Sequence, residues 1–213
     1  MKIVCTSDTH GRPEWKIPPC DVFIHCGDFT SSGSFFETNA FAQKLYDSQV
    51  VRHFLLVPGN HDRYFEQQFE AVERLFDSRC HILIDQEITI EGIRFYGSPW
   101  TPLFNHWCFM ASEKELEQFY NEMPNTLDVL ITHGPPLGIL DPGFKTKHAG
   151  SQALRNAIER RQIRHHVFGH LHGAGGQTVS ETLNDAHTVT YFSNVSACNE
   201  YYSITHSPFT INL

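Results

Sequence analysis

Five short apolar runs in this sequence are each followed at once by polar residues of the types that bind metal ions. Imidazole, carboxylate and amide groups in one set suit Mn²⁺, Fe or Zn²⁺, whereas Ca²⁺ prefers ligands that are all oxygen. A divalent ion held in this way can activate water for hydrolysis. The five clusters are Asp8-Thr9-His10, Gly27-Asp28, Gly59-Asn60-His61-Asp62, His133-Gly134 and Gly169-His170-Leu171-His172.

Each cluster taken alone also has an ordinary structural explanation. An aspartate after a strand commonly forms a turn with its own backbone, and two histidines in a loop are often only solvated. Five such clusters in order, each at the end of an apolar run, are hard to assign to chance. Functional groups in α/β sheets gather beyond the carboxyl ends of the strands. We therefore expect the five clusters to meet at one rim of the fold.

The rest of the chain alternates short apolar runs with amphipathic segments, which predicts an α/β fold with helices outside packed sheets. Glu91-Gly92 separates two short strands and predicts a tight hairpin. The expected strands are 2–6, 22–25, 54–57, 82–85, 88–90, 93–97, 129–132, 166–168, 188–193 and 202–206. The expected helices are 34–47, 64–76, 112–122 and 151–161.

The length and composition fit one globular domain, which we expect to span residues 1–213. The formal net charge of −8 argues against a protein that coats a nucleic acid polymer or a membrane surface. No apolar run approaches the roughly 20 residues of a transmembrane helix. The six cysteines lack paired spacing, and the chain begins without the pattern of a signal peptide. We therefore expect reduced thiols and a cytoplasmic location.

In chain order, the residues of the clusters are D-x-H, G-D, G-N-H-D, H and G-H-x-H. This set of motifs resembles that of the calcineurin-like metallophosphoesterases. The stretch 95–100 and the Asn60-His61-Asp62-Arg63 context are most similar to a branch of small metallophosphoesterase-domain proteins. That branch is associated with the hydrolysis of cyclic nucleotide phosphodiesters. The resemblance implies a four-layer α/β/β/α fold, in which mixed β-sheets pack as a sandwich flanked by helices.

The resemblance also implies a centre of two divalent metal ions, for which we expect manganese, with iron or zinc as alternatives. One metal ion would be held by one aspartate and two histidines, and the other by one asparagine and two histidines, with a second aspartate bridging both. In this sequence the first set is Asp8, His10 and His172, the bridge is Asp28, and the second set is Asn60, His133 and His170.

The implied reaction is in-line hydrolysis of a small phosphodiester by a metal-bound hydroxide, with cyclic nucleotides as a candidate substrate class. His61 would stabilise or protonate the leaving oxygen, and Asp62 would orient the imidazole of His61. A phosphomonoesterase or a protein phosphatase uses the same metal core and stays an alternative. A non-catalytic scaffold on the same fold is a third hypothesis, but every metal-ligand position is filled here, which favours an enzyme.

Two further residues are candidates for substrate binding. Trp100 and Asn105 follow the stretch Gly97-Ser98-Pro99, where a loop could reach a substrate. Trp100 would stack on a nucleotide base and Asn105 would form hydrogen bonds to it. A tryptophan at this position is equally well explained as a core aromatic residue, and the sequence leaves both interpretations open.

Overall fold

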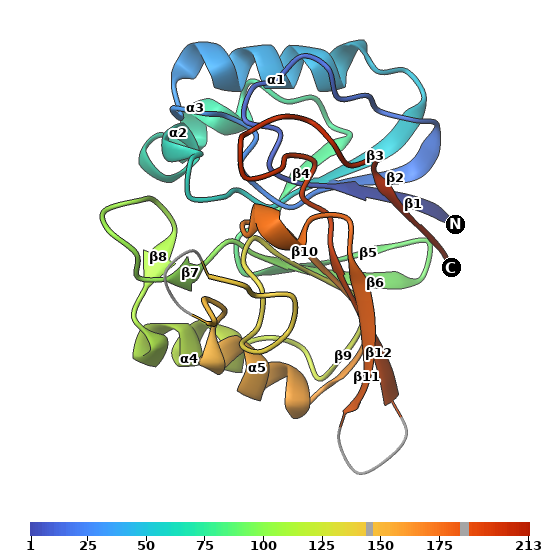
Figure 1. Cartoon of the computed structure of the whole chain (residues 1–213). Helices are drawn as coiled ribbons and strands as arrows, with labels where there is room; N and C mark the ends of the chain where they lie inside the picture. The colour runs from blue at the N-terminus through green and yellow to red at the C-terminus, as the bar shows by residue number, and fades with distance from the viewer. Residues whose placement is uncertain (144–146, 184–187) are drawn as a thin grey trace.

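The computed structural model describes residues 1–143, 147–183 and 188–213, and within them two β-sheets lie face to face between two layers of helices (Figure 1). The first sheet contains four parallel strands and one antiparallel edge strand. Its order is β13 (Phe209–Asn212), β1 (Lys2–Thr6), β2 (Cys20–His25), β3 (Val51–Leu56) and β4 (Cys80–Ile82). The strand β13 pairs antiparallel with β1.

The second sheet has four parallel strands in its centre and an antiparallel strand at each edge. Its order is β11 (Thr178–Leu183), β12 (Thr188–Asn194), β10 (Gln162–Phe168), β9 (Thr126–Thr132), β6 (Ile93–Ser98) and β5 (Gln86–Ile90). The hairpin predicted at Glu91-Gly92 is confirmed: it joins β5 to β6, and both residues adopt a positive φ, as a type I′ turn requires.

Helices cover the outer face of each sheet (Figure 1). The first sheet is covered by α1 (Phe35–Asp47), α2 (Arg63–Gln67) and α3 (Phe69–Glu73), and the second by α4 (Glu113–Asn121) and α5 (Gln152–Glu159). Ser34 and Ser112 each form a capping box that fixes where α1 and α4 begin. Within the described part of the chain, every helix is too short or too polar to cross a membrane.

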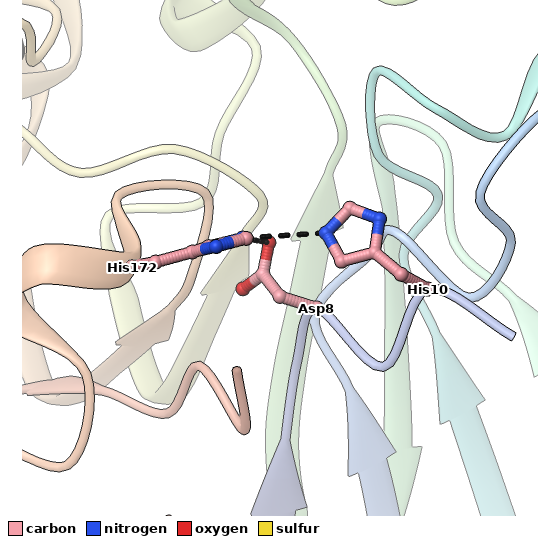
Figure 2. Close-up of side chains that lie close together, drawn as sticks. All are labelled: Asp8, His10 and His172. Atoms are coloured by element: carbon pink, nitrogen blue, oxygen red, sulfur yellow. Dashed lines mark hydrogen bonds and ion pairs between the residues drawn. The ribbon is translucent and has the colours of Figure 1, made fainter. Parts of the chain in front are cut away.

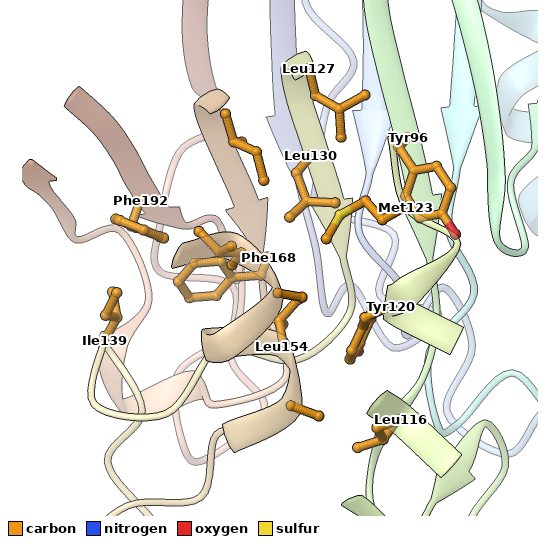
Figure 3. Packing of buried hydrophobic residues seen from close by; sticks show 14 of the residues in the cluster. Tyr96, Leu116, Tyr120, Met123, Leu127, Leu130, Ile139, Leu154, Phe168 and Phe192 are labelled. Atoms are coloured by element: carbon orange, nitrogen blue, oxygen red, sulfur yellow. The ribbon is translucent and has the colours of Figure 1, made fainter. Parts of the chain in front are cut away.

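Three apolar cores fill the spaces between the four layers, because side chains alternate between the two faces of each strand. In β1, Ile3 and Cys5 face the core between the sheets, whereas Val4 faces the helices. In β9, Val129 faces the core between the sheets and Leu130 faces α4 and α5. Figure 3 shows this last core. The α/β/β/α fold expected from the sequence is therefore confirmed.

The structure corrects three predicted elements. The strand expected over 82–85 lies earlier, since β4 ends at Ile82 and residues 83–85 are not part of a strand. The helix expected over 64–76 is two short helices, α2 and α3, with Gln68 between them in a non-helical conformation. No strand forms over 202–206: the side chain of Asn199 accepts hydrogen bonds from the backbone N–H of Tyr201 and Ser203 and makes a turn there, and only Ile204 forms an isolated bridge, to Cys198. The strands β11 and β13 were not expected from the sequence.

The packing in Figure 3 predicts the stability effect of one substitution. Leu130 is fully buried in β9, so Leu130→Ala should lower the free energy of unfolding by about 2–5 kcal/mol through lost contacts and a cavity. Val179, which is exposed on β11, is the matched control, and Val179→Ala should change the stability by less than about 1 kcal/mol. Urea unfolding of both variants measures the difference. Equal effects would show that Leu130 does not contribute to a tightly packed core.

Candidate metal centre

The five polar clusters follow five strands, as the sequence predicts, and the loops after β1 and β2 run side by side. The backbone N–H of Asp8 donates to the carbonyl of Gly27, and that of His10 donates to the carbonyl of Asp28, each at 2.9 Å. Asp8, His10 and Asp28 have φ values of 54°, 44° and 56°. Residues other than glycine rarely adopt this left-handed conformation, and such strain gathers at functional sites.

The first group of candidate ligands consists of Asp8, His10 and His172, whose ligand atoms all lie within 4.8 Å of one another (Figure 2). His172 Nε2 lies 3.4 Å from Asp8 Oδ1 and 3.2 Å from His10 Nε2. The loop after β10 thus brings His172 to the loop after β1, which belongs to the other sheet.

The second group consists of Asp28, His133 and His170, with ligand atoms also within 4.8 Å of one another. His133 Nε2 lies 3.5 Å from Asp28 Oδ1 and 2.9 Å from the side-chain oxygen of Asn60. The other oxygen of Asp28, Oδ2, lies 3.7 Å from His10 Nε2 in the first group. One carboxylate therefore faces both groups.

Backbone carbonyls hold two of the imidazole rings in place. His133 Nδ1 donates to the carbonyl of Cys26 at 2.8 Å, and His172 Nδ1 donates to the carbonyl of Asn199 at 3.1 Å. Because Nδ1 donates to the backbone in each ring, Nε2 is the nitrogen that faces the carboxylates and that could bind a metal ion after losing its proton. This is the usual arrangement of histidines that bind a metal ion.

The charges of the centre also fit a cation. Asp8 and Asp28 are fully buried, yet their pKa values lie well below the usual range: burial would raise each pKa, but nearby His172 and His133, respectively, lower it. Burial alone would lower the pKa of His133, but the Asp28 carboxylate raises it to about 9. Among the described residues, the ion pairs of both carboxylates are with histidines rather than lysine or arginine. Divalent cations would neutralise two buried carboxylates that have no permanent cationic partner.

A cavity of about 760 Å³ opens over this centre. Its lining includes ligands from both groups together with His61, and a loop between the short strands β7 (Thr101–Pro102) and β8 (Met110–Ala111). Asn105 of that loop lines the cavity, and its role in substrate binding stays a prediction. The space is within the range of small-molecule sites and exceeds what a phosphate group alone would fill.

His61 lies at the cavity, but Asp62 does not orient its ring. His61 Nδ1 donates to the carbonyl of Ser31 at 2.7 Å. The carboxylate of Asp62 instead accepts hydrogen bonds from the backbone N–H of Gly59 and from the N–H and hydroxyl of Thr30. The expectation that Asp62 holds the imidazole is therefore wrong. Asp62 ties the loop after β3 to the loop after β2, and it acts on His61 only through the backbone.

Trp100 is a core residue, so its expected role in stacking on a substrate is wrong. Its indole N–H donates to Asp85 at 2.6 Å, and its ring packs against Phe109 and Phe119. Sequence reasoning missed two aromatic residues that do line the cavity, Trp107 and Tyr202. The run of large side chains from Leu103 to Trp107 was the available signal for the first. Tyr202 is missed because the sequence predicts a strand over 202–206 instead of a loop at the cavity.

Comparison with known proteins agrees with this geometry. The model of the calcineurin-like phosphoesterase family matches residues 1–174. Metallophosphoesterase domain-containing protein 1 of Homo sapiens is 36% identical, over 100% of this chain and 71% of its own length. A UPF0046 protein of Caenorhabditis elegans is 32% identical, over 98% of this chain and 73% of its own. In fold, the chain is similar to NAD nucleotidase of Haemophilus influenzae, with a TM-score of 0.53 at 12% identity over 91% of this chain and 44% of that one.

Fold and site together define an α/β/β/α domain with a candidate centre for divalent metal ions where loops from both sheets meet. The chain belongs to the calcineurin-like phosphoesterase family. This family uses divalent metals to hydrolyse phosphoesters, and the two ligand groups described above are where this chain would hold them.

The close packing of the centre against glycine backbone predicts the effect of Gly59→Ala. A Cβ atom at this position would lie 2.3 Å from Asp28 Oδ1 and 2.7 Å from His133 Cε1. Both side chains must then move, so the variant should bind Mn²⁺ roughly 10–100-fold more weakly than the wild type and lose metal at concentrations that keep the wild type loaded, the usual cost of disturbing groups that position metal ligands. Elemental analysis after dialysis against Mn²⁺ measures this.

Gly92→Ala is the control, because nothing lies within 4 Å of a Cβ atom there and the hairpin is part of an edge strand pair. Its metal content should equal that of the wild type. A Gly59→Ala protein that is folded and fully loaded with metal would contradict the described arrangement of Asp28 and His133.

Proposed function

We propose that this chain hydrolyses small phosphodiesters, cyclic nucleotides among them, with two divalent metal ions. The observation that carries the proposal is the position of Asp28. Its Oδ2 lies 3.7 Å from Nε2 of His10, and its Oδ1 lies 3.5 Å from Nε2 of His133. A buried carboxylate between two groups of ligands is suited to bridge two ions. Asp8, His10 and His172 would hold the first ion, and Asn60, His133 and His170 the second.

The mixed set of carboxylate, imidazole and amide donors supports manganese, with iron or zinc as alternatives. When bound, such a pair of ions lowers the pKa of a shared water and neutralises charge on the phosphoryl oxygens. The protein contributes rigidity: buried loops and backbone hydrogen bonds to His133 and His172 fix the ligands in place. The cytoplasmic location and the lack of a nucleic acid or membrane partner stay predictions from composition.

We assign His61 to the leaving oxygen of the substrate. Its Nδ1 is occupied by the carbonyl of Ser31, so Nε2 is free to face the cavity. Its backbone N–H donates to Asp28 Oδ1 at 2.8 Å, which keeps the ring beside the centre. His61 also lies within ligand distance of His10 and Asp28. The two possible roles of His61, metal ligand and proton donor, can be told apart by the metal content of a variant, because only the loss of a ligand lowers it.

The paired variants Asp28→Asn and His61→Gln test this assignment. Asp28→Asn removes the charge of the bridging carboxylate, so metal content and hydrolysis of an aryl phosphodiester should fall together. His61→Gln should keep the metal while kcat falls by roughly 10²–10⁴-fold, the usual contribution of a positioned acid or base. Elemental analysis and steady-state kinetics on the same samples give both quantities.

Chelated wild-type protein, before and after the return of Mn²⁺, provides the reference states for this comparison. Activity should disappear with the metal and return with it. Full activity in protein shown to be free of metal would refute the proposed reaction. Loss of metal from His61→Gln as complete as from Asp28→Asn would make His61 a ligand instead.

Substrate charge predicts a preference for diesters over monoesters. A diester carries one negative charge and a monoester carries up to two, so a chain with a net charge of −8 repels the diester less as it approaches. We expect kcat/KM for an aryl diester to exceed that for the matched aryl monoester. Higher kcat/KM for the monoester would instead support the phosphomonoesterase alternative.

A further inference from the structure

A row of aromatic rings lies along one wall of the cavity over the metal centre. The ring of Trp107 lies 4.4 Å from that of His61 at a tilt of 32°, and His61 lies edge-on to His10 at 4.8 Å. Tyr202 lies edge-on to His10 from another side, also at 4.8 Å. The rings of Trp107, His61, His10 and Tyr202 are therefore in contact one after the other, and all four residues line the cavity. Only Trp107 and Tyr202 in this row are neither ligands nor the proposed acid.

Protein packing does not account for the position of Trp107. Its side chain is 40% exposed, and Leu103 and Phe104 in the same loop are each 64% exposed and line the same cavity. In contrast, Trp15 is buried in the core next to α1. Exposed apolar groups that gather at the mouth of a cavity commonly mark a ligand site, because ligand binding removes them from water.

We propose that Trp107 determines substrate specificity by stacking on a flat aromatic group carried at the leaving side of the phosphoester. This inference rests on the proposed function, because His61 marks the leaving side only if it acts at the leaving oxygen. A group attached to that oxygen would lie next to His61, and the indole ring of Trp107, 4.4 Å from the imidazole of His61, is the exposed aromatic ring in contact with it.

The surroundings of Trp107 match a flat group better than a charged or bulky one. Leu103 and Phe104 supply apolar surface beside the indole ring, and Asn105 supplies an amide that can form hydrogen bonds with the edge of a heteroaromatic ring. Two aromatic rings in contact are favoured by more than their buried area alone. The substrate class is therefore phosphoesters with an aryl or nucleobase-like group, rather than esters of simple alcohols.

A different role for Trp107 must be separated from this one. The indole ring could act only by keeping His61 in position, in which case its removal would slow every substrate equally. A specificity role predicts instead that the loss depends on whether the ligand is flat. The test therefore compares ligands that differ in shape but not in charge.

The experiment uses protein loaded with Mn²⁺ and two phosphonates, benzylphosphonate and cyclohexylmethylphosphonate. In each ligand a CH₂ group replaces the leaving oxygen, so neither is hydrolysed; both carry a six-carbon ring and the same phosphonate group, but one ring is flat and aromatic and the other is puckered and saturated. Wild-type protein should bind benzylphosphonate roughly two- to twelvefold more tightly by titration calorimetry. In Trp107→Ala this ratio should fall to about one, and in Trp107→Phe it should be partly retained.

Phe36→Ala is the matched control, since Phe36 is an 82% exposed aromatic residue on α1 that does not line the cavity. It should keep the wild-type ratio. Fluorescence is an independent measurement: benzylphosphonate should quench part of the tryptophan emission in the wild type, and that part should be absent from Trp107→Phe. This comparison stands even if Trp107→Ala does not fold.

Two failures are distinguishable. If the wild type hydrolyses an aryl phosphodiester but binds both phosphonates equally, or if Trp107→Ala weakens both equally, the specificity role is overturned while the proposed function stands. If the metal-loaded wild type neither hydrolyses an ester nor binds either phosphonate, the proposed function fails, and the role of Trp107 fails with it.

Discussion

The buried carboxylate of Asp28 is the constraint on which the rest of this site depends. Its two oxygens face His10 on one side and His133 on the other, and Asp8 places a second carboxylate nearby. Two buried negative charges without lysine or arginine are unfavourable unless cations neutralise them. Asp28 reaches this point with a positive φ, and only a residue without a Cβ atom fits beside it at position 59.

The two sheets make this arrangement possible because each supplies part of the centre. The first sheet carries Asp8 and Asp28, and the second carries His133, His170 and His172, so neither the group of Asp8, His10 and His172 nor that of Asp28, His133 and His170 is complete on one sheet. The core between the sheets fixes their distance from each other. Residues beyond the stretch matched by the family model also contribute, since the carbonyl of Asn199 holds His172. The support for the ligands thus extends past the recognised motifs.

The sequence predicts the ligands well because each cluster combines an apolar run with metal-binding residue types within a few positions. It predicts the supporting contacts poorly because these depend on distant backbone. Nothing local shows that Asp62 accepts hydrogen bonds from Thr30 rather than from His61. The break at Gln68 is marked by neither glycine nor proline. The sequence leaves open whether Trp100 packs against the core or reaches a substrate, and only the fold shows that Trp100 packs against the core while Trp107 lines the cavity.

The separation of the ligands along the chain determines when the site can exist during folding. The backbone N–H of His170 donates to Asp8 across 162 positions, and β13 pairs with β1 from the opposite end of the chain. Contacts this distant form late, because the entropy of loop closure must be overcome before they stabilise anything. A growing chain on the ribosome would therefore lack the last histidine of each of the two proposed ion sites until His170 and His172 emerged, and uptake of both ions would coincide with the last steps of folding.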